Sequence, residues 1–263
     1  MQFHIPTLAP EVLFNIGGLP VTNTMVNASL ATLIFLVIGI IIYRNTHLKP
    51  RGTQNFIEYF LEILLGYFDQ VTGERKKTIR FLPIVGSVFF FILLSNWLGL
   101  LPGTGSITVG HTMLLRPANT DLNLTLAMAL VAVVSSHVFG LITVGVFTHI
   151  NKFIQIGSLV KSIKKGPIGI FTAVIEFAVG LIEIVSELSK VLSLSLRLFG
   201  NIFAGEVLIS VIGTLVGLLV PTPFMLLELL VGLIQASVFT MLTLVYLTVM
   251  TSAPHGAHEE SHH

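Results

Sequence analysis

A run of more than fifty residues, from Gly166 to the Pro221-Thr222-Pro223 segment, contains no turn signal and is apolar along most of its length. A continuous helix of this length would be about 80 Å long, at ~1.5 Å per residue, whereas a helix that crosses a bilayer upright needs only ~30 Å. The run therefore folds either as a hidden helical hairpin or as one steeply inclined helix. Because no Asn-Gly or Pro-Gly turn interrupts it, we predict an inclined helix over residues 166–220, with Gly200 as its candidate bend.

The composition is that of a chain embedded in lipid. Hydrophobic residues make up 53% of the 263 residues and charged residues only 10%, with a mean hydropathy of +0.91, whereas soluble domains carry about 25% charged residues. A net charge of +1 argues against nucleic acid as a partner, since phosphate binding needs a concentrated basic surface. The absence of cysteine excludes disulfides and thiolate metal sites, and we expect neither a metal nor a cofactor.

Four other runs are long and apolar enough to cross the bilayer, and we predict spans over residues 24–43, 82–101, 122–148 and 224–250. Residues 53–72 differ, because apolar and acidic side chains recur there at helical spacing, which is typical of an amphipathic helix lying in the interface. The charged cluster Glu74-Arg75-Lys76-Lys77 is interpreted as a solvated anchoring loop. The expected fold is a single all-α polytopic membrane domain with five membrane-embedded helices and one interfacial helix, flanked by an external segment (1–23) and a polar tail (251–263).

The loops differ in their positive charge. Lysine and arginine gather between residues 44 and 51 and again between residues 149 and 165, whereas the loop 102–121 has one arginine, Arg116, and no lysine. Because cytoplasmic loops carry the excess of lysine and arginine, this pattern predicts an external N-terminus and a cytoplasmic C-terminus. The first twenty residues lack the basic and apolar regions of a signal peptide, so we expect the spans themselves to direct targeting.

The charged residues of the long run follow a helical repeat. Seven residues bring a helix to within about 20° of two full turns, so residues seven apart lie in one stripe along the helix. Two more polar residues, at spacings of four, lie on the same stripe. Its members are Glu176, Glu183, Glu187, Lys190, Arg197 and Asn201. Arg197 has no carboxylate three or four residues away with which to pair. Since a charge at the bilayer centre costs at least about 2.5–3.5 kcal/mol, we expect Arg197 to be functional, with its partner on another helix or another chain.

Two acidic residues lie outside this stripe. Glu206 is nine residues beyond Arg197, half a helical turn away, and Glu228 shares a face of the last span with Gln235. Both acids stand in apolar sequence without a basic neighbour, so we expect them to be protonated or to line water. Groups that exchange protons at membrane depth are what a proton relay needs.

Simpler interpretations exist for several polar residues. Ion pairing along the helix would also account for Glu187 and Lys190, and Glu176 would reach the interface by snorkelling. We interpret His137 as an interhelical hydrogen-bonding residue. Asp121 either caps the third span or lines a channel mouth.

Four motifs carry a family resemblance: LLSNWLGLLPG at residues 93–103, PANTDLNLTLAMAL at 117–130, LSLSLRLFGNIFAGE at 192–206 and IQASVFTMLTLVYL at 234–247. In sequence, order and spacing they resemble subunit a of the F-type ATP synthase, from about residue 50 onward. The resemblance implies a non-catalytic, proton-conducting stator subunit of the bacterial inner membrane. It also implies that the last two helices form an inclined hairpin against the c-ring, whose subunits each bear one carboxylate, and that the b subunits of the peripheral stalk are further partners.

The resemblance also implies roles for individual residues. Arg197 matches the arginine that pairs transiently with the ring carboxylate and separates two half-channels, and Glu183 matches a carboxylate of the inner half-channel. The outer half-channel is matched by Asn201, Glu206, Glu228 and Gln235. Many members pair a histidine with an acid across these two helices, whereas two acids stand here, which leaves Glu206 and Glu228 able to share a proton. H⁺ is the expected ion, and Na⁺ stays open because the ring sets the choice.

A different functional class is a secondary transporter that binds an anionic substrate at Arg197. Such transporters are commonly built from inverted repeats with paired broken helices. No internal repeat is found here, because nearly all intramembrane charges lie in the second half of the chain. A scaffold subunit without a transport role would not need Arg197.

Overall fold

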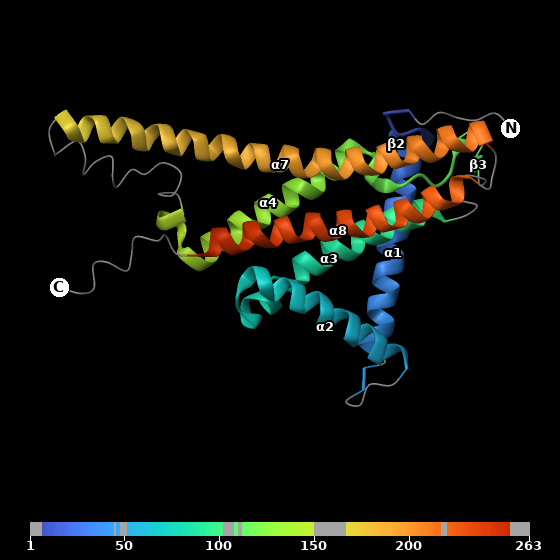
Figure 1. Cartoon of the computed structure of the whole chain (residues 1–263), viewed down its shortest axis with the longest axis horizontal. Coiled ribbons are helices and arrows are strands. Elements are labelled where there is room, and N and C mark those ends of the chain that lie inside the picture. Colours follow the sequence, from blue (N-terminus) through green and yellow to red (C-terminus); the bar gives the residue numbers. More distant parts are fainter. Residues whose placement is uncertain are drawn as a thin grey trace.

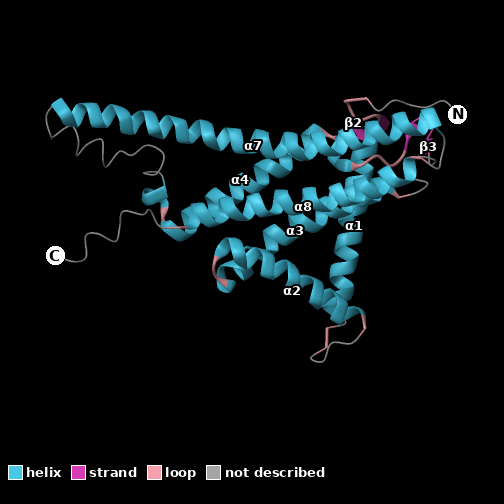
Figure 2. Ribbon diagram, in the orientation of Figure 1, coloured by secondary structure: helices cyan, strands magenta, loops and turns pink. Residues whose placement is uncertain are grey.

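The computed structural model describes residues 7–44, 46–47, 52–101, 108–109, 112–149, 167–216 and 220–252. Its long elements are helices: α1 (Asn23–Arg44), α2 (Thr53–Thr72), α3 (Arg75–Leu100), α4 (Leu122–Val144), α7 (Pro167–Val216) and α8 (Pro221–Thr251). Four short strands form two antiparallel pairs, β1 (Val12–Ile16) with β2 (Leu19–Thr22) and β3 (Thr108–Val109) with β4 (Thr112–Met113), and η2 (Ala118–Thr120) is a 3₁₀ turn. Figure 2 shows that helices make up most of the described structure.

Five of these helices are long and apolar enough to span a membrane: α1, α3, α4, the Phe177–Leu215 part of α7, and α8. The chain is therefore a helical membrane protein, as its hydropathy predicts. The small strand pairs were not expected from the sequence. β1 and β2 are joined by Gly17 and Gly18, both with positive φ, a conformation that glycine adopts without strain.

Four helices form a layered bundle that α1 crosses steeply. Figure 1 shows α7 and α8 running along the long axis of the molecule, with α3 and α4 beside them, and contacts join α3 to α8, α4 to both α7 and α8, and α7 to α8. α7 is continuous through Gly200 over 50 residues, so the apolar run is one helix and not a hidden hairpin. At about 1.5 Å per residue it is roughly 75 Å long, far longer than an upright crossing requires.

α3 begins at Arg75, earlier than the expected span start at residue 82, so most of the charged cluster belongs to the helix and is not a loop. Gly73 ends α2 in the left-handed conformation, with φ of 68°, and the chain re-enters helix two residues later. Arg75 then reaches back to α2, where its guanidinium lies 2.8 Å from Asp69 and 2.6 Å from Glu62. Arg75 therefore holds α2 against α3.

Two other helix ends differ from the expected bounds. α4 ends at Val144, because Gly145 has a φ of 90°, and residues 146–149 form a further helical turn. α8 begins at Pro221, so the Pro221-Thr222-Pro223 segment that ends the long apolar run forms the first turn of α8. Proline is tolerated there because the first N–H groups of a helix have no intrahelical acceptor. The basic residues expected at 152–165 and the tail from 253 to 263 lie outside the described residues.

The main core lies where α3, α4, α7 and α8 meet. Its buried side chains are Val88, Phe89, Ile92, Leu93, Ala129, Ala132, Val133, Val191, Leu194, Leu198, Ile202, Ala236 and Phe239. Small residues on α4 and α8 let the helices approach closely. The opposite face of α7 is bare and apolar, since Leu188, Leu192 and Leu196 are 63%, 57% and 53% exposed. α7 therefore presents one face to the bundle and leaves the other for a partner or for lipid.

Candidate functional site

Arg197 lies on the bare face of α7. Its neighbours Leu194 and Leu198 are buried in the core, whereas Arg197 itself and Leu196 are exposed. Tyr246 of α8 is close enough to interact with it electrostatically. Within the part of the chain that the structure describes, Arg197 makes neither a hydrogen bond nor an ion pair, so a cation stands in the middle of an apolar helix face.

Asn201 and Gln235 meet one turn beyond Arg197. The Asn201 Nδ2 donates to Gln235 Oε1 over 2.7 Å, which joins α7 to α8. Gln235 is 3% exposed, and its Nε2 has no hydrogen-bond partner among the described residues. The two amides thus form a polar patch beside Arg197, and the Gln235 Nε2 is left as a donor without a partner in the described part of the chain. The family resemblance assigned both residues to the outer half-channel, and the structure adds a direct hydrogen bond between them.

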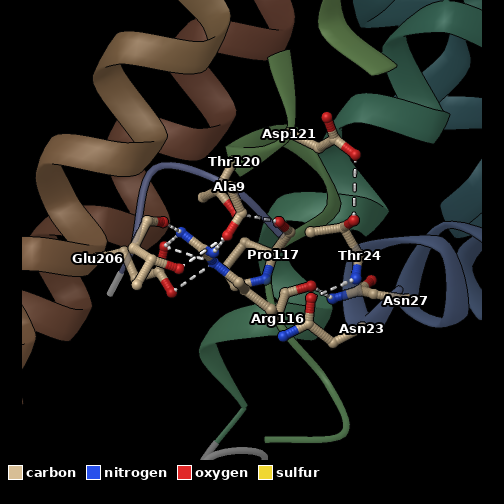
Figure 3. Close-up of polar contacts among 10 residues, drawn as sticks. Ala9, Asn23, Thr24, Asn27, Arg116, Pro117, Thr120, Asp121 and Glu206 are labelled. Carbon is tan, nitrogen blue, oxygen red and sulfur yellow. Dashed lines mark hydrogen bonds and ion pairs between the residues drawn. The ribbon is translucent and has the colours of Figure 1, made fainter. Parts of the chain in front are cut away.

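Glu206 is ion-paired to Arg116, so the expectation that it has no basic neighbour is wrong. The Arg116 Nε lies 2.9 Å from Glu206 Oε1 and 3.1 Å from Oε2, and Nη2 lies 3.0 Å from Oε2. Figure 3 shows the guanidinium pointing at the carboxylate from the loop before η2. Arg116 is 5% exposed, and its guanidinium lies 5.9 Å from the centre of the Phe203 ring. The only signal in the sequence was indirect: Arg116 is the one arginine of the loop 102–121, which has no lysine.

Backbone from the N-terminal segment completes the coordination of Arg116. Its Nη2 donates to the carbonyl of Thr7 over 2.8 Å, and its Nη1 donates to that of Ala9 over 3.3 Å. On the other side, Asn27 of α1 donates through Nδ2 to the Arg116 carbonyl over 2.8 Å. The arginine is therefore held by three separate parts of the chain.

Asp121 caps the N-terminus of α4 and so fixes the end of this loop. Of the two interpretations of Asp121, the helix cap is confirmed. Its Oδ1 accepts from the backbone N–H of Asn123 over 2.9 Å, and its Oδ2 accepts from the Thr24 hydroxyl over 3.3 Å. Nearby, Asn119 donates to Asn96 Oδ1 over 2.7 Å. The loop is thereby tied to α1, α3 and α4, and Arg116 is placed by rigid surroundings.

Glu228 lies against α7 beside Glu206 but in a different environment. It is 7% exposed, and its carboxylate fits over Gly205, where any Cβ would collide with it. Its Oε1 has no hydrogen-bond partner among the described residues. The two acids that the sequence grouped together are thus distinct: Arg116 engages both oxygens of Glu206, whereas Glu228 keeps an oxygen available.

Gly205→Ala tests this contact. The added methyl group overlaps the Glu228 carboxylate, and overpacking of this kind typically costs about 1–3 kcal/mol, so we expect a lower thermal midpoint for the purified protein in detergent. Gly200→Ala is the matched control, since a Cβ there meets nothing within 4 Å. We expect Gly205→Ala/Glu228→Ala to recover the midpoint, and equal midpoints for the two single variants would contradict the contact.

The inner part of the charged stripe divides between two environments. Glu183 is half-buried on α7, about 21 Å from Arg197 along the helix at 1.5 Å per residue. Lys190 Nζ lies 2.5 Å from Glu187 Oε1, which confirms the ion-pair interpretation. His137 contacts Glu187 from α4, which confirms it as an interhelical residue. The side chain of Glu176 lies outside the described part of the chain.

Comparison with known proteins identifies the family of the chain. Residues 25–248 match the ATP synthase A chain family. The chain is 33% identical to the ATP synthase subunit a of Moorella thermoacetica over 238 residues, covering 90% of this chain and 94% of that protein. It is 31% identical to that of Syntrophobacter fumaroxidans (262 residues; 99% and 95%) and 35% identical to that of Gloeobacter violaceus (237 residues; 90% and 87%). The chain therefore belongs to the ATP synthase A chain family, the non-catalytic, proton-conducting stator subunits of the F-type ATP synthase.

Proposed function

We propose that Arg197 divides two offset proton half-channels and faces the c-ring across the bare side of α7. The observation that carries this proposal is an exposed cation on an otherwise apolar helix face. Lipid is a poor environment for a charge, whereas a ring of subunits that each present one carboxylate would offer a partner in turn. Ion flow past Arg197 then drives rotation of the ring and ATP synthesis.

The outer half-channel ends at Glu228, with Asn201 and Gln235 between it and Arg197. Glu228 has a carboxylate oxygen without a partner among the described residues, which suits a group that takes up a proton and passes it on. Glu206 plays a different part. Because the Arg116 guanidinium engages both Glu206 oxygens, this pair fixes α7 against the outer loop beside the pathway.

The inner half-channel includes Glu183, which lies on the same stripe as Arg197. A ring carboxylate that has carried its proton round is forced to ionise as it meets the guanidinium, and the proton leaves toward Glu183. Arginine suits this position because a guanidinium keeps its charge even in a protein interior, so the residue does not become a proton shuttle itself.

The surroundings of the subunit follow from the same assignment. The α7–α8 hairpin lies steeply inclined in a bacterial inner membrane, with α1 crossing more upright, the N-terminus outside and the C-terminus in the cytoplasm. The b subunits of the peripheral stalk hold it against the torque of the ring. The ion is H⁺, and a ring site that selects Na⁺ would change the ion without changing this geometry.

Single cysteines test which face meets the ring, since the chain has none of its own. We expect Leu192→Cys and Leu196→Cys to form disulfides with cysteines placed beside the ring carboxylate, in membranes that contain the whole complex. Leu198→Cys, at a fully buried position, is the control for access, and Leu33→Cys, 58% exposed on α1, is the control for a lipid-facing surface. Cross-linking from Leu33→Cys alone would contradict the proposed face.

Purification in mild detergent separates this function from an anion transporter. We expect the chain to co-purify with a ring oligomer and a soluble ATPase. A transporter would instead purify alone and bind its substrate through Arg197.

A further inference from the structure

A second group of ionisable side chains lies inward of Arg197, between α4, α7 and the turn at residues 146–149. Glu187 and Lys190 come from α7, His137 from α4 and His149 from the turn. Glu187 is ten residues before Arg197, which is about 15 Å along the helix at 1.5 Å per residue. Neither the outer half-channel nor Glu183 accounts for this group.

The contacts arrange three of these side chains in a row. His137 Nε2 lies 3.5 Å from Glu187 Oε2, and His137 Nδ1 lies 3.2 Å from His149 Nε2. His137 therefore makes contacts through both ring nitrogens. An imidazole held in this way can accept a proton at one nitrogen and release one from the other, and the reverse change of tautomer resets it.

The row is sheltered, and it points toward the inner end of the bundle. Glu187 and His137 have side chains that are 12% and 26% exposed, and His149 is 5% exposed. The His149 ring packs on Gly140, at a point where the carbonyl of Met250 near the end of α8 also lies. His149 is the first residue of the basic segment 149–165. The row therefore ends on the side that the charge pattern assigns to the cytoplasm.

Every helix packed around the row contributes a charged or ionisable neighbour. On α7, Lys190 pairs with Glu187, and its Nζ lies 5.2 Å from the ring centre of Tyr246 on α8. Arg197 interacts electrostatically with the same tyrosine. From α3, Arg80 lies 5.7 Å from the centre of the Phe139 ring, two residues after His137. The row thus adjoins the surroundings of Arg197 through Lys190 and Tyr246.

Two other uses of the group are less suitable. A metal site needs three ligands converging on one point, and the described residues contain no such cluster of histidine and acidic side chains. A purely structural ion pair would need only Glu187 and Lys190, and would leave unexplained why two imidazoles continue the row away from the lysine.

We infer that Glu187, His137 and His149 form a proton-conducting row that leads from the inner half-channel, beside Glu183, to the cytoplasmic side. This inference rests on the proposed function. Glu187 lies between Arg197 and Glu183 on α7, one helical turn from Glu183, so a proton released near Arg197 reaches the Glu187 carboxylate first. The proton then passes from Glu187 to His137 Nε2. His137 in turn releases the proton on its Nδ1 to His149 Nε2. Each group returns to its starting charge when the proton moves on.

Passive proton flux through membrane vesicles stripped of the soluble ATPase tests the row. We expect His137→Gln and Glu187→Gln to lower the flux at least about tenfold, since a positioned proton-transfer group typically contributes about 10²–10⁴-fold. Added imidazole should restore flux in His137→Ala, an effect that repacking alone does not produce.

Two further variants separate conduction from stability. His47→Gln changes an exposed histidine between α1 and α2 and should conduct like the wild type. Glu187→Gln/Lys190→Met removes both charges of the ion pair, so it should retain the assembled complex and still conduct poorly. Wild-type flux in this double variant, or in His137→Gln, would overturn the row. If Glu183→Gln still blocks flux and the α7 cysteines still cross-link, the proposed function would stand.

Discussion

Arg197→Ala is expected to abolish ATP synthesis driven by an imposed proton gradient in inverted membrane vesicles, while passive proton leak persists or rises. Under the proposed function, a protonated ring carboxylate would then pass α7 without being forced to ionise, and the two half-channels would no longer be separated. ATP synthesis should therefore fall to the level of vesicles that have no proton gradient.

Arg197→Lys separates the role of charge from that of the guanidinium. Lysine loses its proton readily when desolvated, whereas arginine does not, so we expect this variant to synthesise ATP poorly too. Arg44→Ala, at the exposed last turn of α1, is the control and should remain coupled. Normal synthesis by Arg197→Ala in sealed vesicles would show that the half-channels are divided by another group.

Arg116→Ala is expected to destabilise the purified subunit by about 3–5 kcal/mol, because removing one member of a buried ion pair leaves the other charge uncompensated. Glu206 would lose its three guanidinium contacts, and the carbonyls of Thr7 and Ala9 would lose theirs. Thermal unfolding in detergent measures the loss. ATP-driven proton pumping in vesicles should fall as well, because the outer loop is no longer fixed beside Glu228.

The matched control is Arg75→Ala, which breaks contacts to Glu62 and Asp69 at a far more exposed site, where ion pairs are worth at most about 1 kcal/mol. A second comparison uses Arg116→Met/Glu206→Gln. It leaves no charge uncompensated and should regain most of the stability, because replacing a whole buried pair is often close to neutral. If Arg116→Ala cost no more than Arg75→Ala, the pair would not organise this end of the molecule.

The sequence was a good guide wherever the deciding information is local. Hydropathy places the helices, and the periodicity of residues 53–72 identifies α2, because burial in lipid or at its surface acts on each segment separately. Spacing by seven also placed Arg197 on a stripe. Helix ends were less certain: α3 begins at Arg75 and α8 at Pro221, since caps and tertiary contacts decide where a helix starts.

The sequence by itself determined that this chain is a multi-helix membrane protein with one long helix bearing an intramembrane arginine. Only the tertiary structure decided which acids are paired. Arg116 and Glu206 are 90 residues apart, and His137 and Glu187 lie on different helices, so neither pair leaves a local pattern. A buried charge takes whichever partner the packing brings within reach. For this reason the structure distinguishes the two acids. Glu206 is paired with Arg116, whereas Glu228 packs on Gly205 and its Oε1 has no hydrogen-bond partner among the described residues.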